Sequence, residues 1–277
     1  MHVAVRQPPP DPPELPEGAA PRWPPWYAGV GFLVALSATL IAVGIVSVFT
    51  TGLDGSGEDD PTFTIVATLV QSAIFVGTAV LFASFTRRPK AWHFGLRRTR
   101  LWPAVGWTAL GMFTFYVLAA TYSVAVQPDV EQTVAEDLGS DQGTFGLIAA
   151  GVMIVCVAPA AEEFFFRGFF YRALRSRFAP LAAAAIDGAL FGVIHFDFSS
   201  SDALLILPPL ALLGFIFCLV YEKTGSLYPV IAMHSINNSI AYGAQADGWE
   251  VSAVLGPLML IACVLLPRLS AQAPALR

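Results

Sequence analysis

The chain has 277 residues, of which 56% are hydrophobic and 13% are charged, and its formal net charge is −5. An ordinary soluble domain carries roughly 25% charged residues, so this composition excludes a soluble globular protein and indicates one that crosses the membrane several times. We expect no nucleic-acid partner.

Proline dominates the beginning of the chain, where nine of the 21 prolines lie before Trp26. A segment of this kind has too little apolar surface to fold and favours the extended polyproline II conformation. It also lacks the basic region and apolar core of a cleavable signal peptide. Residues 1–25 are therefore predicted to be a disordered tail.

Apolar stretches long enough to cross roughly 30 Å of hydrocarbon recur through the rest of the sequence. They predict an all-α fold, a polytopic membrane bundle of about eight transmembrane helices. The expected spans are 27–50, 62–85, 102–126, 144–170, 180–197, 203–221, 227–244 and 251–267. The first three contain no ionisable residue and are interpreted as a scaffold.

Basic residues occur on alternate connections between these spans. The connection 86–100 carries six Lys and Arg residues, the segment 167–178 carries four arginines, and Lys223 marks a third basic loop, whereas the loops between them carry none. By the positive-inside rule the basic loops face the cytoplasm, and with an even number of spans both termini are predicted to be cytoplasmic. Short loops and the lack of a soluble domain favour a bacterial cell membrane.

Charged residues occur within the apolar stretches only in the second half of the chain. The four are Glu162, Glu163, Arg167 and Asp187. An unpaired charge costs roughly 2.5–3.5 kcal/mol at the bilayer centre, so together they would cost about 10 kcal/mol or more, comparable to the stability of a typical domain. They must be paired, neutralised or hydrated, which indicates an interior site.

Helical spacing separates the two glutamates. Glu163 and Arg167 are four residues apart with the acid N-terminal, the better orientation for an ion pair on one helix. Glu162 points about 100° away around the helix, and Pro159 is expected to kink or restart the helix just before the pair. We interpret Glu163 as the partner of Arg167 and Glu162 as free for chemistry. The alternative is a purely structural ion pair beside one protonated glutamate.

Two histidines accompany these charges. His195 lies near the end of the fifth span, and His234 and Asn238 lie four residues apart on one face of the seventh. The fourth and fifth spans form a hairpin whose tip lies near residue 178, and Glu162 and His195 are almost equally far from this tip along the chain. Because every residue of a helix adds the same rise, the two lie at about the same depth, so we expect them to face each other.

This set of side chains suits the hydrolysis of an acyl bond by water. A carboxylate with a histidine can take a proton from water, while a second histidine and an amide can donate hydrogen bonds to the developing oxyanion. The GxSxG motif of serine hydrolases, the HExxH motif of zincins and the GxGD motif of intramembrane aspartyl proteases are absent from the sequence.

Three motifs resemble those of one known family. EEFFFR at 162–167 fits EExxxR, FGVIH at 191–195 fits FxxxH, and HSINN at 234–238 fits HxxxN. In this order on successive helices they resemble the CAAX protease and bacteriocin-processing family (CPBP, or Abi), which includes the eukaryotic CAAX prenyl endopeptidase. The resemblance covers roughly residues 143–245.

The resemblance implies an intramembrane endopeptidase that needs no cofactor. In such an enzyme Glu162 with His195 activates water, and His234 and Asn238 line the oxyanion site. The matching supporting residues are Glu163, Arg167 and Phe191. Glu162, His195 and His234 could instead supply three zinc ligands, although no HExxH or HxxxH pairing is present. A zinc metalloprotease is therefore the alternative.

The chain is thus expected to comprise the tail 1–25, scaffold helices 26–142, a catalytic core 143–245, and a last helix with a short tail, 246–277. The expected substrate is a membrane-embedded, membrane-associated or lipidated protein or peptide in the lipid bilayer, since the prokaryotic members of the family that the chain resembles are tied to bacteriocin maturation, immunity and peptide cleavage. The rival interpretation is a non-catalytic scaffold, immunity protein or transporter. A carrier would place ionisable residues in both halves of the chain, which favours the enzyme. The oligomeric state and the membrane face on which the site opens are left open.

Overall fold

The structure, a computed structural model, describes residues 23–51, 60–128, 133–196 and 201–269. These residues form helices joined by turns, with no strand among them, so the predicted all-α fold is confirmed. Most of the predicted tail lies outside the described residues. Trp23, at the end of that tail, is 1% exposed and packs against Phe94 and Phe169, so the folded core includes this residue.

Each of the eight expected spans coincides with a helix. The long helices are α1 (Trp26–Thr51), α2 (Pro61–Thr86), α3 (Leu101–Val126), α5 to α7 (Gly143–Val152, Ala158–Phe165 and Tyr171–Arg175), α8 (Pro180–Val193), α9 (Leu207–Thr224), α10 (Leu227–Gln245) and α11 (Trp249–Leu269). Short elements are the 3-10 helices Ala91–Phe94 and Ser201–Ile206 and the four-residue helix α4 (Val134–Asp137).

Within the described ranges, six helices are long and apolar enough to cross a membrane, so the protein is an integral, multi-pass membrane protein. The other two expected spans differ in character. Helix α8 is apolar but has only 14 residues, and α10 has 19 residues but carries several polar side chains. A count of eight complete crossings therefore stays a prediction.

The fourth span is one continuous rod of 33 residues, Gly143–Arg175. Two five-residue π-helical segments, Met153–Val157 and Phe166–Phe170, flank α6 within this rod. Regular α-helix resumes at Ala158, beside Pro159 in the first turn of α6, where the sequence predicted that the helix restarts. Single π-helical turns inside α-helices occur frequently at functional sites, and α6 is the segment that carries both glutamates.

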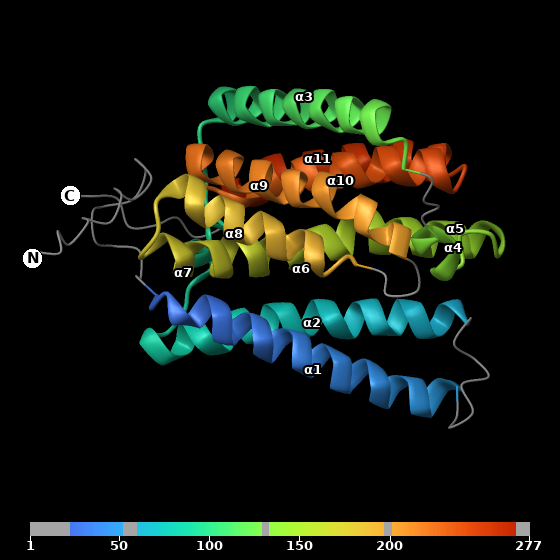
Figure 1. Ribbon diagram of the computed structural model, residues 1–277, viewed down its shortest axis with the longest axis horizontal. Helices are drawn as coiled ribbons and strands as arrows, with labels where there is room; N and C mark the ends of the chain where they lie inside the picture. The colour runs from blue at the N-terminus through green and yellow to red at the C-terminus, as the bar shows by residue number, and fades with distance from the viewer. Residues whose placement is uncertain (1–22, 52–59, 129–132, 197–200, 270–277) are drawn as a thin grey trace, which may run out of the picture.

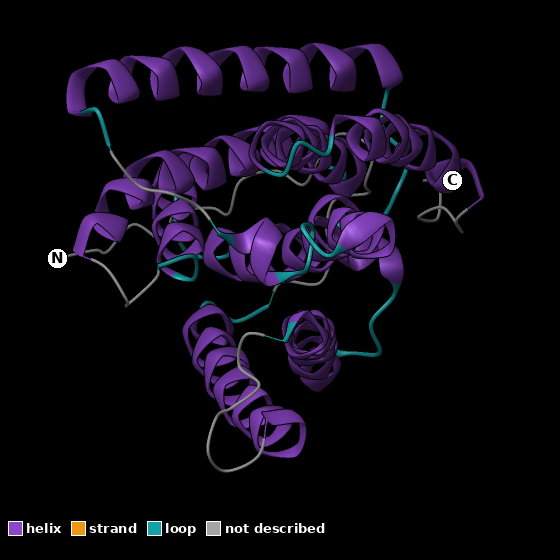
Figure 2. Ribbon diagram, turned by 90° about the vertical axis from the view of Figure 1, so that its right-hand side faces the viewer, coloured by secondary structure: helices purple, strands orange, loops and turns teal. Residues whose placement is uncertain are grey.

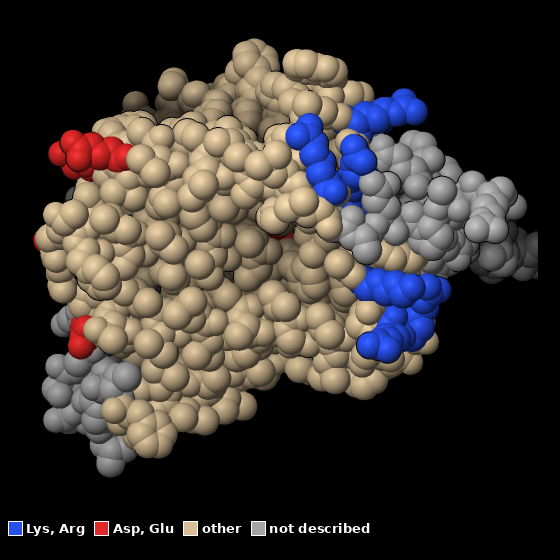
Figure 3. All heavy atoms as spheres, turned by 180° about the vertical axis from the view of Figure 1, so that it is seen from behind, with Lys and Arg blue, Asp and Glu red and all other residues tan. Residues whose placement is uncertain are grey.

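Both ends of the described chain lie at the same end of the bundle. Helix α1 begins beside the α2–α3 connection in Figure 1, and Arg268 near the end of α11 lines the same groove as Arg98 and Arg100 of that connection. Figure 3 shows Lys and Arg gathered at this basic end and most of the visible Asp and Glu at the opposite, acidic end. An even number of crossings agrees with this arrangement, and the cytoplasmic location of the basic end stays a prediction.

The rod occupies the centre of the bundle (Figures 1 and 2). Helices α1 and α2 pack on one side of it, α8 to α11 lie on the other, and α3 is outermost, against α9 and α10. Four phenylalanines of the rod are almost completely buried: Phe165, Phe166, Phe169 and Phe170. Phe165 stacks on Phe75 of α2, and Phe170 lies 5.9 Å from Phe32 of α1 between ring centroids. Aromatic packing thus joins the first two helices to the rod.

Helices α8 and α9 approach closely because glycines lie at their contact. A Cβ atom on Gly188 would lie 2.5 Å from the carbonyl oxygen of Ala211 and 2.6 Å from the amide nitrogen of Phe215. A Cβ atom on Gly214 would lie 2.9 Å from the Cα atom of Gly188. Small residues permit such backbone contact in membrane bundles. The contact fixes α8, which forms one wall of the site described below.

We expect Gly188→Ala to destabilise the protein. Its methyl group would collide with backbone atoms of α9, and overpacking of this kind costs about 1–3 kcal/mol. Since 1 kcal/mol shifts Tm by about 2–4 °C in proteins of roughly this size, thermal unfolding in detergent should show a fall of about 3 °C or more. Gly106→Ala in α3 is the control, because nothing lies within 4 Å of its Cβ position. Equal Tm values for the two variants would contradict the proposed contact.

Candidate active site

Four side chains singled out from the sequence line one pocket of about 440 Å³: Glu162, His195, His234 and Asn238. Oε2 of Glu162 lies 3.8 Å from Nε2 of His195 and 3.9 Å from Nε2 of His234. This oxygen has no hydrogen-bond partner in the described part of the chain. Each of the two Nε2 atoms is thus close enough to Oε2 of Glu162 to be linked to it through one water molecule.

The equal depth inferred for Glu162 and His195 agrees with this distance. Helix α8 ends at Val193, earlier than the expected residue 197, and His195 lies in the turn that follows. The His195 side chain is 33% exposed, whereas that of Glu162 is 11% exposed and that of His234 is 4% exposed. Of the three side chains, that of His195 is therefore the most accessible from outside the protein.

Both histidines have a defined orientation. Nδ1 of His195 lies 2.7 Å from the backbone carbonyl oxygen of Phe191, and since a carbonyl only accepts, Nδ1 must donate. Nδ1 of His234 lies 2.9 Å from Oε1 of Glu163, a carboxylate oxygen that also accepts from Arg167. When neutral, each histidine therefore presents the lone pair of Nε2 to the pocket.

The ion pair predicted from helical spacing is confirmed. Arg167 Nη1 donates to Glu163 Oε1 at 2.9 Å, and Nη2 donates to the carbonyl oxygen of Gly214 at 2.9 Å. A second carboxylate, Asp187 Oδ1 of α8, lies 3.5 Å from Arg167 Nε. All three charged side chains have an exposed fraction of 0%, so a fully buried guanidinium lies between two carboxylates.

The partnership of Asp187 with Arg167 was missed at the sequence level. The same hairpin geometry that predicted the equal depth of Glu162 and His195 also predicts this pair. Arg167 and Asp187 lie on opposite arms of the same hairpin, at nearly equal distances along the chain from residue 178. The two are therefore also at nearly the same depth.

Phe191 links the buried ion cluster to the histidines. The guanidinium carbon of Arg167 lies 4.5 Å from the centroid of its ring, in a cation–π contact. The same ring lies 5.8 Å from the ring of His234, and the backbone carbonyl of Phe191 fixes His195. A second ring, that of Phe217 in α9, covers the guanidinium at 5.0 Å. The supporting position of Phe191 inferred from the motif thus has a physical basis.

Asn238 is held by the irregular backbone of the rod. In the π-helical segment the amide of Ala158 donates to the carbonyl of Met153. By the same pattern the carbonyl of Ile154 would pair with residue 159, which is a proline and has no N–H group. Nδ2 of Asn238 instead donates to this Ile154 oxygen at 2.9 Å. One amide hydrogen of Asn238 is therefore used, and the other is available to the pocket.

Uncharged side chains also line the pocket, and the pattern of ionisable residues in the sequence did not predict them. Thr68 and Gln71 of α2 line it, so α2, one of the three spans interpreted as a scaffold, contributes side chains to the pocket. Val134 and Gln245 also line it, and both are exposed at the acidic end of the bundle. The pocket thus extends from the middle of the bundle toward that end.

The donor set has the chemistry of a zinc site. Each histidine offers Nε2 while its Nδ1 group donates to an oxygen, as metal-bound histidines usually do, and Glu162 supplies a carboxylate. The N–O separations of 3.8 and 3.9 Å exceed the edge of about 3.3 Å of a tetrahedron with zinc-ligand bonds of 2.0–2.1 Å. In the described part of the chain no group of three His, Cys, Asp or Glu residues is spaced to hold a metal ion.

Comparison with known proteins shows which family the segment that holds this site resembles. A family model described as type II CAAX prenyl endopeptidase Rce1-like matches residues 144–240, which contain all four pocket residues named first. The uncharacterized protein YyaK of Bacillus subtilis (strain 168) is 37% identical over 95 residues, which are 33% of this chain and 32% of that protein. The match thus spans about a third of each chain, and no solved structure matches. Residues 144–240, the segment that holds the site, therefore match the Rce1-like family of CAAX prenyl endopeptidases, which supports the resemblance inferred from the three motifs.

Proposed function

We propose that the protein is an intramembrane endopeptidase that hydrolyses a peptide bond of a membrane-embedded or membrane-associated protein or peptide. The observation that carries this proposal is the convergence of Glu162 Oε2 with Nε2 of His195 and of His234, at 3.8 and 3.9 Å. A carboxylate oxygen that has no hydrogen-bond partner among the described residues and lies beside the Nε2 atoms of two histidines in a pocket is suited to holding and deprotonating water. The Rce1-like family of residues 144–240 supports the same activity.

In the first step, water bound at this point donates hydrogen bonds to Glu162 and His195. Glu162 takes a proton as the water oxygen forms a bond to the carbonyl carbon of the substrate, and the carbonyl π electrons move to its oxygen. The water enters past the exposed side of His195. The backbone carbonyl of Phe191 holds the imidazole ring of His195 in the required orientation through the hydrogen bond at 2.7 Å.

The oxyanion is stabilised from α10. Asn238 donates its remaining amide hydrogen, while its bond to Ile154 holds the side chain in place. His234 donates from Nε2 only when it is protonated, because its Nδ1 hydrogen is committed to Glu163. In the last step the C–N bond breaks, and the leaving amine takes the proton from Glu162.

We propose that this reaction needs no metal ion. The second candidate is a zinc-dependent reaction, which the orientation of both histidines favours, with Glu162, His195 and His234 as the residues that would hold the ion. Zinc would supply Lewis-acid activation of water. A non-catalytic scaffold, immunity protein or transporter is the alternative from another class, and it gives no role to the Glu162 oxygen that has no hydrogen-bond partner among the described residues.

Glu162→Gln is expected to abolish turnover without loss of stability. Glutamine keeps the shape of the side chain but cannot accept the proton, and loss of general base catalysis lowers kcat by about 10²–10⁴-fold. Cleavage of membrane-associated and prenylated peptides by purified protein, followed by mass spectrometry, measures the effect beside thermal unfolding. Glu250→Gln, which changes an exposed carboxylate of α11, is the control. Undiminished cleavage by the Glu162 variant would rule out this role.

Glu163→Ala, by contrast, is expected to destabilise the fold. It removes one of the two carboxylates at Arg167 and the acceptor of His234. Breaking a buried ion pair costs about 3–5 kcal/mol, and we expect the lower end, about 3 kcal/mol, because Asp187 still faces the guanidinium. Glu163→Gln retains an acceptor oxygen and should recover part of the lost Tm. If Glu162→Gln and Glu163→Ala lower Tm equally, the two glutamates do not have separate roles.

The metal-free reaction predicts less than one tenth of a zinc ion per protein molecule and activity that chelators leave unchanged. Elemental analysis by mass spectrometry, followed by cleavage assays with and without 1,10-phenanthroline, measures both quantities. A zinc content near one per molecule, with activity lost on chelation and restored by added zinc, would establish the metalloprotease instead.

A further inference from the structure

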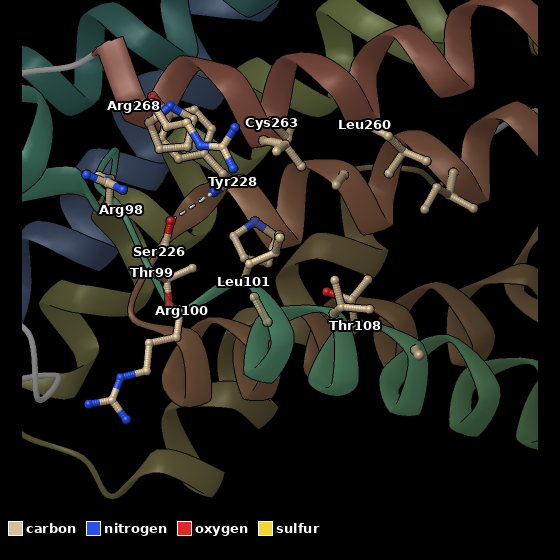
Figure 4. Close-up of a pocket in the computed structure, with 18 of the residues that line it drawn as sticks. Arg98, Thr99, Arg100, Leu101, Thr108, Ser226, Tyr228, Leu260, Cys263 and Arg268 are labelled. Carbon is tan, nitrogen blue, oxygen red and sulfur yellow. Dashed lines mark hydrogen bonds between the residues drawn. The ribbon is translucent and has the colours of Figure 1, made fainter.

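A second cavity of about 720 Å³ lies between α3, α10 and α11, on the side of α10 away from the active site (Figure 4). Ala232 and Ile236 of α10 form its floor, whereas His234 and Asn238 of the same helix line the catalytic pocket. The two cavities have no lining residue in common. The proposed proteolytic reaction does not involve this groove.

The groove is apolar along most of its length. One wall runs from Leu101 to Met112 of α3 and the other from Arg268 back to Leu260 of α11. At about 1.5 Å per residue these walls are about 16 and 12 Å long, close to the half-thickness of about 15 Å that one leaflet contributes to the hydrocarbon core. The groove thus has the length of an acyl chain in a single leaflet, and it begins at the basic end.

Three arginines surround the basic end of the groove: Arg98, Arg100 and Arg268. Figure 4 shows Arg268 and Arg98 near Tyr228 and Ser226, while the guanidinium of Arg100 points away from them. All three are exposed, and none forms an ion pair with a carboxylate of the described residues. No acidic residue lines the groove. The hydroxyl groups of Thr99 and Ser226 donate to backbone carbonyls, so the available charge there is that of the arginines.

We propose that this groove binds an anionic phospholipid of the leaflet at the basic end. One acyl chain lies between α3 and α11 over Ala232 and Ile236, and the phosphate group binds at Arg98 and Arg268. A free phosphate ion would leave the apolar walls uncovered, whereas a zwitterionic lipid such as phosphatidylcholine would place a cationic group beside the arginines. A phospholipid with net negative charge satisfies both parts of the groove, and the inference does not depend on the proteolytic activity.

Native mass spectrometry of the full-length protein tests this binding. The detergent-purified protein is incubated with equimolar phosphatidylglycerol and phosphatidylcholine of the same chain length. We expect one phosphatidylglycerol to be retained per protein, at least fivefold in excess over phosphatidylcholine. The double variant Arg98→Gln/Arg268→Gln should lose most of this excess. The matched control Arg88→Gln/Arg177→Gln removes two exposed arginines outside the groove and should bind as the wild type does.

A second variant tests the apolar part without altering charge. Ala109→Trp places a large side chain on the α3 wall and should lower retention of phosphatidylglycerol at least fivefold, with Tm measured for every variant. Equal retention of the two lipids, equal losses in both arginine pairs, or full binding by Ala109→Trp would each overturn the proposal. Displacement of the lipid by glycerol 3-phosphate alone would indicate a phosphate site instead, and displacement by a lipidated peptide at lower concentration would indicate a substrate-binding groove.

Discussion

The buried charge of Arg167 is the constraint on which the arrangement of the core depends. A guanidinium with no exposure requires compensation from its neighbours, and its partners come from different segments: Glu163 from the rod, Asp187 from α8 and the carbonyl of Gly214 from α9. Each partner must reach the same point, so the ion cluster fixes how these helices pack. Because Glu163 also bonds to His234, the same cluster orients α10 and one of the two histidines of the site.

Irregular backbone segments position two side chains of the site, Asn238 and His195. The π-helical segment and Pro159 leave the carbonyl of Ile154 without its usual partner, and Asn238 occupies that position. The turn that ends α8 likewise places His195 outside regular helix, where Phe191 holds it by a backbone carbonyl. Unpaired backbone groups are costly inside a membrane, so these side-chain bonds stabilise the fold and position the reacting groups together.

Local periodicity predicted part of this arrangement. The spacing of Glu163 and Arg167 predicted their ion pair, because that pair depends on one helix alone. Equal distances from the hairpin tip predicted that Glu162 faces His195, because that arrangement depends on one short connection. The bond between Glu163 and His234 depends on how α10 rotates against α6, for which no short connection sets a register. Gln71 carries no charge and sits in an apolar span, so no pattern in the sequence separates it from a packing residue.

The central claim is that Glu162 and His195 hold the water that attacks the substrate. An experimental density map of the wild-type protein at a resolution that shows ordered water tests it most directly. The account predicts one water molecule within about 3.2 Å of Glu162 Oε2 and of His195 Nε2. A peak at about 2.0–2.1 Å from these two atoms and from His234 Nε2, the distance of a zinc ion, or a Glu162 side chain turned away to pair with Arg167, would contradict it.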